Sequence, residues 1–158
     1  MRGPFVRRRN GDLDVTLTAV EADIIRSVVE QMSTVLGDPP ARLLPPAYED
    51  DPVAQAEYAG MMTQDLMDGK RRALSSMTAT IERGKIKRDG WRVTVTADEA
   101  QDWLAVLNDA RLTLGTRLAV TEETYERDID PDSEDAAAHE VFRYLGYIEE
   151  YLVETLMD

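Results

Sequence analysis

The side chains of this chain that could do chemistry are few in kind. It has one histidine, His139, and no cysteine, which excludes disulfides, thiolate metal sites and a cysteine nucleophile. It contains no nucleophile elbow, P-loop or dinucleotide-binding glycine pattern. The alternating acids over 128–134 resemble the start of a calcium loop, but Ser133 replaces the required glycine and His139 the bidentate glutamate. We therefore expect no enzyme activity, no cofactor and no metal.

Arg111 is the charged residue with the most unusual position. It falls within the apolar face of a predicted helix, and Asn108 and Gly115 lie along the edge of that face. A core helix seldom carries an arginine there without a carboxylate to meet it. Glu21 is the first candidate, because it points near the apolar stripe of its own helix, and Gly115 would let a second backbone approach closely. Alternatively, Arg111 and Asn108 line a groove for a peptide or an anion.

Basic residues form the second candidate surface. The formal net charge is -13, so most of the surface should repel nucleic acid. Two stretches are nevertheless basic. The first contains Arg2, Arg7, Arg8 and Arg9. The second contains Lys70, Arg71, Arg72, Arg83, Lys85, Lys87, Arg88 and Arg92. They are either solvated charges or contacts for an acidic protein or DNA, and neither a recognition-helix turn nor an aromatic row for stacking bases accompanies them.

Hydrophobic periodicity predicts the helices that must position these side chains. Thr18 with Glu21, and Thr96 with Glu99, have the spacing of capping boxes, and apolar stripes follow both at helical spacing. A third stripe includes Gly69, which weakens a helix and makes a break there plausible. The predicted helices cover 18–36, 52–83, 96–120 and from about 133 to the end.

Alternating residues predict a small antiparallel sheet. Strands over 5–9 and 13–17 flank Asn10-Gly11, a dipeptide that suits a type I′ hairpin turn. A third strand over 91–95 should pair with this hairpin, because an isolated strand cannot satisfy its backbone hydrogen bonds. Residues 84–90 are expected to be a connector. The predicted fold class is therefore α+β, mainly α-helical, with about four main helices.

Composition restricts the class of protein further. The chain has 158 residues, of which 43% are hydrophobic and 31% charged, as in a soluble single domain over 1–158. No apolar run reaches the roughly 18 residues of a membrane span, and no apolar segment follows the basic start as in a signal peptide. Because it lacks cysteine, the chain fits a reducing cytoplasm. We expect a cytoplasmic protein with no membrane partner.

The helix over 52–83 is rich in methionine. Met61, Met62, Met67 and Met77 could be adaptable core residues or a soft binding face. Core packing is the simpler interpretation. Exposed apolar area on this helix would be the first place to look for a homodimer interface.

Five blocks of sequence occur in an order that is characteristic of a known family. They are WLAVLNDARLTLGTRL (103–118), EADIIRSVVEQ (21–31), LLPPAYEDDPVAQAEY (43–58), D-L-x-x-x-K (65–70) and the C-terminal YLVETLMD. Together they resemble the AosR-like family of actinobacterial proteins, formerly described as a domain of unknown function. The resemblance implies a non-enzymatic transcriptional regulator of the oxidative-stress response that acts through a sigma factor or RNA polymerase.

The same resemblance implies an alternative and one departure. Family genes tend to neighbour the gene of the ClpS adaptor, so an adaptor or interaction protein in Clp-dependent proteolysis is the alternative. A disulfide redox switch is proposed within the family, but this chain has no cysteine and cannot form one. If it responds to oxidants, methionine oxidation or a partner must do the sensing. We expect a protein partner, with any DNA contact confined to the basic stretches.

Overall fold

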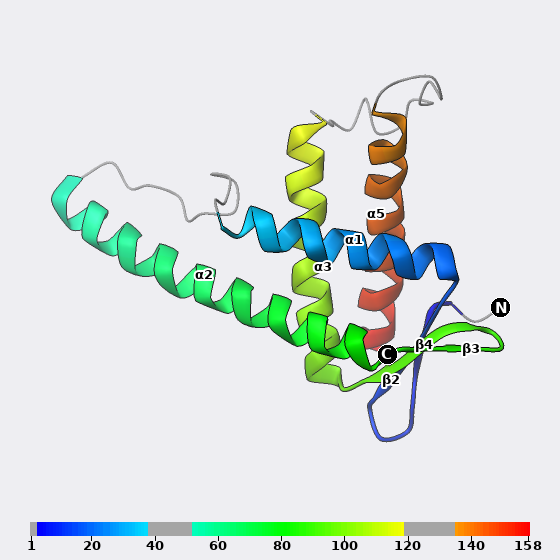
Figure 1. Cartoon of the computed structure of the whole chain (residues 1–158). Coiled ribbons are helices and arrows are strands. Elements are labelled where there is room, and N and C mark those ends of the chain that lie inside the picture. Colours follow the sequence, from blue (N-terminus) through cyan, green and yellow to red (C-terminus); the bar gives the residue numbers. More distant parts are fainter. Residues whose placement is uncertain (1–2, 38–51, 119–134) are drawn as a thin grey trace.

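The computed structural model describes residues 3–37, 52–118 and 135–158, and of 52–59 the backbone alone. The elements follow in the order β1 (Phe5–Arg7), β2 (Leu13–Leu17), α1 (Ala19–Val35), α2 (Pro52–Arg83), β3 (Lys85–Lys87), β4 (Gly90–Val95), α3 (Ala97–Arg117) and α5 (Ala136–Met157). The described chain is thus a mainly helical α+β fold with four helices, which confirms the predicted class (Figure 1). Residues 38–51 between the first two predicted helices, the alternating acids over 128–134 and the predicted helix start near 133 lie outside the described residues.

The sheet is antiparallel, with the strand order β1-β2-β4-β3. Val15 lies opposite Phe5 on one side and Val93 on the other, and all three side chains are buried. Because side chains alternate along a strand, the residues between them face the other side. One face of the sheet therefore joins the core, and the opposite face carries polar side chains such as Asp14, Thr94 and Arg92.

The connection between β1 and β2 is longer than the sequence predicts. Arg7 pairs with Leu13, so residues 8–12 form the loop and a two-residue type I′ turn at Asn10-Gly11 does not occur. The Arg8 amide donates to the Asp12 carbonyl at 2.7 Å, and the Gly11 amide donates to the Arg8 carbonyl at 3.0 Å. Gly11 still supplies a positive φ of 94°, which glycine adopts without steric cost.

Residues 84–90, predicted to be a connector, contain strand β3. Its register sets Lys87 opposite Gly90, so that Arg88 and Asp89 make the turn. Gly90 has a φ of 124°, and a Cβ there would meet the Leu17 carbonyl oxygen. All three residues of β3 are exposed and two of them are lysines, so the sequence shows no alternating apolar pattern that would predict a strand here. The free edge of β4, whose backbone groups need partners, decides this pairing.

The observed helix starts agree closely with the starts predicted from the sequence, whereas the observed helix lengths agree less well. Both predicted capping boxes are present, at Thr18 in α1 and at Thr96 in α3. α3 ends at Arg117, short of the predicted Val120. α2 runs through Gly69 without the predicted break, because the packing of its second half outweighs the roughly 1 kcal/mol that a helical glycine costs.

A buried polar contact holds the centre of the core. Trp103 Nε1 donates to Thr80 Oγ1 at 2.6 Å, and both residues have 0% exposure. The same hydroxyl donates to the Met77 carbonyl at 2.7 Å. The Phe5 ring meets Trp103 edge-on at 6.4 Å between centroids. These contacts join β1, α2 and α3 at one point.

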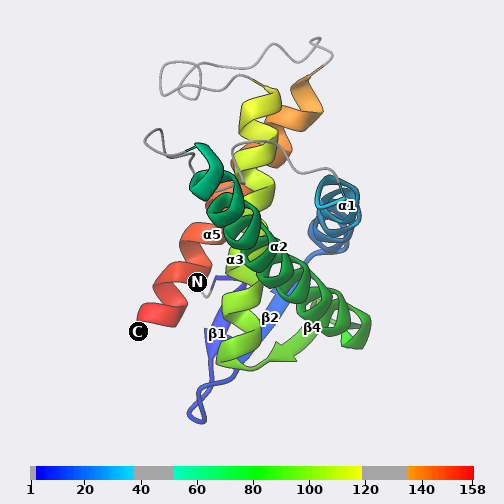
Figure 2. The same ribbon diagram turned by 90° about the vertical axis from the view of Figure 1, so that its left-hand side faces the viewer.

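The first half of α2 extends beyond the other helices and the sheet in Figure 1, and Figure 2 views the molecule from that side. Among the described side chains of α2, the buried ones begin at Met67 and include Met77, as expected for core methionines. Met61 and Met62 are exposed instead, so a core role is wrong for these two. Within the described part of the chain, no helix is long and apolar enough to cross a membrane.

Candidate interaction sites

Arg111 lies at the contact of α3 with α5, not with α1. Its guanidinium lies over the Phe142 ring, 5.3 Å from the centroid, and Nη1 is 3.9 Å from Oε2 of Glu149. The prediction of Glu21 as the partner is therefore wrong. Glu21 is used at its own helix start, where Oε1 accepts from the Thr18 amide at 2.9 Å.

The ion pair of Arg111 with Glu149 is loose. Arg111 Nε and Glu149 Oε1 are buried, and neither has a hydrogen-bond partner among the described residues. Burial raises the pKa of Glu149 above its ordinary value, although Arg111 opposes this shift. Arg111 thus contributes chiefly by covering Phe142.

Gly115 and Asn108, the two other residues predicted to form a site with Arg111, do not share a site with it. A Cβ on Gly115 would lie 2.9 Å from Cε2 of Phe142, so Gly115 makes room for a ring and not for a second backbone. Asn108 is exposed and does not line the hollow beside Arg111, whose walls include Gly146 and Glu149. The predicted groove with both Arg111 and Asn108 in its wall is not formed.

The first three residues of the predicted basic segment contact groups on neighbouring helices. Lys70 Nζ donates to both carboxylate oxygens of Asp109, at 2.8 and 2.9 Å. Arg71 Nη2 donates to the Leu36 carbonyl at 3.1 Å. Arg72 Nη2 donates to Asp102 at 3.2 Å. These contacts join α2 to α1 and α3, although Arg71 and Arg72 stay exposed.

Asp109 was not predicted as a site residue, although its position in the helix indicates one. It lies three residues after Val106, a spacing that places it near the buried face of the helix. A carboxylate there needs a cation as much as Arg111 needs an acid.

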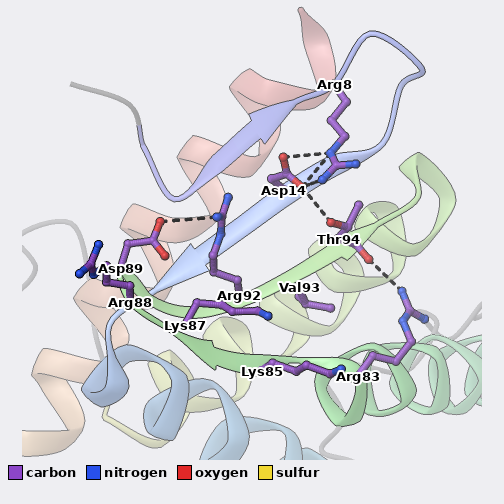
Figure 3. A pocket seen from close by; sticks show the side chains of 10 residues that line it. All are labelled: Arg8, Asp14, Arg83, Lys85, Lys87, Arg88, Asp89, Arg92, Val93 and Thr94. Carbon is purple, nitrogen blue, oxygen red and sulfur yellow. Dashed lines mark hydrogen bonds and ion pairs between the residues drawn. The ribbon is translucent and has the colours of Figure 1, made fainter.

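The rest of the second basic stretch gathers with Arg8 on the open face of the sheet, around a shallow hollow of about 570 Å³ (Figure 3). We define the basic sheet face as Arg8, Arg83, Lys85, Lys87, Arg88 and Arg92. Arg8 comes from the β1–β2 loop, Arg83 from the end of α2, and the others from β3, β4 and their turn. The fold thus brings Arg8, from the N-terminal stretch, onto the same surface as the second basic stretch.

Acidic residues neutralise one side of this face. Arg8 Nε donates to both oxygens of Asp14, at 2.9 and 3.0 Å, and Thr94 Oγ1 donates to Asp14 at 2.8 Å. The hydrogen bond from Arg8, supported by the one from Thr94, lowers the pKa of Asp14. Asp89 Oδ2 lies 3.6 Å from Arg92.

Arg83 is paired as well. It donates to both carboxylate oxygens of Glu99, at 2.8 and 3.1 Å, and to the Thr94 carbonyl at 3.0 Å. The hydrogen bond from Arg83 lowers the pKa of the Glu99 carboxyl. Glu99 is the N3 residue of the α3 capping box, so one side chain caps α3 and holds the end of α2.

Three residues of the basic sheet face, Lys85, Lys87 and Arg88, differ from Arg8, Arg83 and Arg92 in their surroundings. All three are exposed, and none has an ion-pair partner among the described residues. They lie together on β3 and its turn, at the edge of the sheet. This is a local excess of positive charge in a chain whose net charge is -13.

The described residues include no group of three or more metal-ligand side chains close enough to hold a metal ion. His139 is half-buried in α5. The fold is a small, mainly helical α+β structure with basic residues on the open face of its sheet.

The chain belongs to the family described as Domain of unknown function (DUF2017), whose profile matches residues 1–156. It is 33% identical over 136 residues to the oxidative stress regulator AosR of Mycobacterium tuberculosis, covering 77% of this chain and 59% of the relative. It is 31% identical over 130 residues to the putative oxidative stress regulator AosR of Mycobacterium leprae, covering 73% and 57%. The resemblance inferred from the sequence is thereby confirmed. The chain spans less than two thirds of the length of these relatives, and no solved structure matches it.

Proposed function

We propose that this protein is a non-enzymatic regulator of the oxidative-stress response that acts in the cytoplasm by binding another protein. Its relatives carry the name oxidative stress regulator. A sigma factor or RNA polymerase is the partner that this role favours. The chain has no cysteine, one histidine and no nucleophile elbow, so its sequence shows no recognisable nucleophile–base pattern. Binding is therefore the activity that the molecule supports best.

The observation that carries this proposal is the basic sheet face. Lys85, Lys87 and Arg88 have no acidic partner among the described residues, and Arg92 has only the longer contact with Asp89. An acidic patch on a partner would complement these charges and speed the encounter. Side chains on paired strands are also held more rigidly than those on loops.

The overall charge favours a protein partner over duplex DNA. A DNA duplex presents phosphates along its whole length, and the rest of a chain with a net charge of -13 would repel them. An acidic patch on a protein can instead match the basic sheet face alone. The hollow is shallow and open, unlike the enclosed pockets that bind small molecules.

Binding of purified RNA polymerase core enzyme and of purified sigma factors tests this proposal. The labelled full chain should bind one of them with an affinity that falls as salt rises. Lys87→Glu should weaken this binding roughly tenfold, which corresponds to about 1.4 kcal/mol. Arg117→Glu is the matched control, because it changes the charge equally at an exposed residue on α3; it should change the affinity less than about twofold.

Other outcomes distinguish the alternatives. Equal losses for Lys87→Glu and Arg117→Glu would mean that net charge, and not the basic sheet face, controls binding. Binding to purified Clp components, with none to polymerase or sigma factors, would support the proteolytic adaptor. A salt-dependent shift of duplex DNA by the wild-type chain and not by Lys87→Glu would identify DNA as the partner of the same face.

A further inference from the structure

Exposed methionines on α2 form a second chemically distinctive feature of the molecule. Met61 is 71% exposed and Met62 39%, whereas Met32, Met67 and Met77 are 3%, 4% and 0% exposed. In a chain without cysteine, thioether sulfur is the side-chain group that peroxides oxidise reversibly. Because oxidation follows exposure, Met61 and Met62 should react before the core methionines.

The helix around these two residues has little to hold it. None of the side chains over 60–66 is buried, and the core contacts of the described part of α2 begin at Met67. Helix without tertiary packing depends on intrinsic propensity and on pairs of side chains four residues apart. Gly60 lowers that propensity, and Met62 and Leu66 have the spacing of an apolar pair.

We propose that Met61 and Met62 are an oxidant-modification site at which a peroxide forms methionine sulfoxide and thereby loosens the first half of α2. A lone pair of the thioether sulfur attacks one peroxide oxygen, and the O–O bond breaks. The sulfur is oxidised by two electrons, and the other oxygen leaves with both protons as water. A thiol-dependent methionine sulfoxide reductase reverses the change, oxidising its thiols as the sulfoxide oxygen leaves as water.

The expected effect is confined to one end of the molecule. A sulfoxide is polar, so Met62 in this form no longer suits an apolar pair with Leu66, four residues further on. The second half of α2 stays held by Met77 and Thr80 in the core. The basic sheet face lies at the other end of α2, where the helix ends at Arg83. The modification site therefore stands independently of the proposed partner-binding function.

Peroxide titration of the full-length protein, followed by peptide mass mapping and amide hydrogen exchange, tests the proposal. Sulfoxide should form at Met61 and Met62 roughly tenfold faster than at Met67 and Met77. Exchange over 60–66 should rise about threefold or more with oxidation and return after reductase treatment. Sulfoxide at both residues with unchanged exchange over 60–66 would overturn the proposal, as would equal oxidation rates at exposed and buried methionines.

Two variants separate this effect from general oxidation. Met61→Leu/Met62→Leu keeps two good helix formers without sulfur, so peroxide should leave its exchange over 60–66 unchanged. Met157 is 81% exposed at the end of α5 and will also be oxidised, so Met157→Leu should respond to peroxide as the wild type does. A peroxide-dependent rise in exchange that persists in the double leucine variant would assign the effect elsewhere and contradict the proposal.

Discussion

Lys70 and Asp109 form an ion pair between α2 and α3, with Lys70 Nζ 2.8 Å from Oδ1 and 2.9 Å from Oδ2. The side chains are only 17% and 10% exposed. A pair withdrawn from water to this degree stabilises little by its presence, but removing one partner leaves the other charge without compensation. The pair thus determines how α2 lies on α3 more than how stable the domain is.

Asp109→Ala should therefore lower the free energy of unfolding by about 3 kcal/mol, because the Lys70 ammonium would lose its acceptor. The double variant Lys70→Met/Asp109→Leu should regain most of this loss, since it buries apolar side chains of similar size. Urea unfolding of the wild type and both variants measures the difference. If the double variant is as unstable as Asp109→Ala, the loss comes from packing and not from the unpaired charge.

The second prediction concerns the contact of Trp103 with Thr80. Thr80→Val keeps the shape of the side chain but leaves Trp103 Nε1 buried without an acceptor, which should cost about 2 kcal/mol. Thr80→Ser keeps the hydroxyl and loses a methyl group, so it should cost only about 1 kcal/mol. Thermal unfolding compares the variants. A valine variant as stable as the wild type would show that this hydrogen bond contributes nothing net.

Acid should destabilise the domain through Glu99 and Asp14. The pKa of each carboxyl is lower in the folded chain than its ordinary value of 4.5 or 3.8, so the unfolded chain binds protons more readily. The contribution is complete above these ordinary values and is lost as pH falls through the lowered pKa. Unfolding free energy measured from about pH 5 to pH 2 should fall less steeply in Glu99→Gln.

Glu82→Gln is the control for this experiment, because Glu82 is an exposed acid next to Arg83 that has no ion-pair partner among the described residues. It should leave the acid slope unchanged. A slope that is the same in Glu99→Gln as in the wild type would contradict the prediction, because the pKa of Glu99 would then be equal in the folded and unfolded chains.

Glu149 should change the pH dependence of stability in the opposite direction to Glu99 and Asp14. Burial raises the pKa of its carboxyl above the ordinary 4.5, so the folded chain holds this proton more readily and stability falls as pH rises through that range. Glu149→Gln should therefore be more stable than the wild type at pH 7, and the difference should vanish below about pH 4. Thermal unfolding at the two pH values measures it.

Glu150→Gln, at the exposed neighbouring position, should match the wild type at both pH values. If Glu149→Gln is instead less stable than the wild type at pH 7, the contact with Arg111 is stronger than its 3.9 Å separation suggests.

Local sequence patterns were sufficient for most elements of this fold. Thr18 and Thr96 mark two helix starts because a hydroxyl and a glutamate three residues later satisfy free backbone amides within one turn. Apolar stripes predicted the helices, and alternation predicted three of the four strands. β3 could not be predicted in this way, since Lys85 and Lys87 show no buried face and the strand depends on the edge of β4.

The candidate sites depended on long-range contacts, and there the sequence was a weaker guide. It identified Arg111 as a residue that needs a carboxylate, because an arginine on an apolar helix face is costly alone. It could not choose Glu149 over Glu21, since that choice depends on which helix α3 packs against. It also gave no reason to expect that Lys70 forms an ion pair and that Lys85 forms none with the described residues.

The sequence by itself determined the mainly helical α+β class, the exclusion of thiol chemistry and the family to which the chain belongs, because composition and short-range patterns carry that information. Only the tertiary structure decided which charges are neutralised. The packing of α2 on α3 withdraws Lys70 into an ion pair, and strand pairing brings Arg8 beside Arg92 on one surface. These contacts join residues far apart in the chain, so they exist only once the helices and strands have packed.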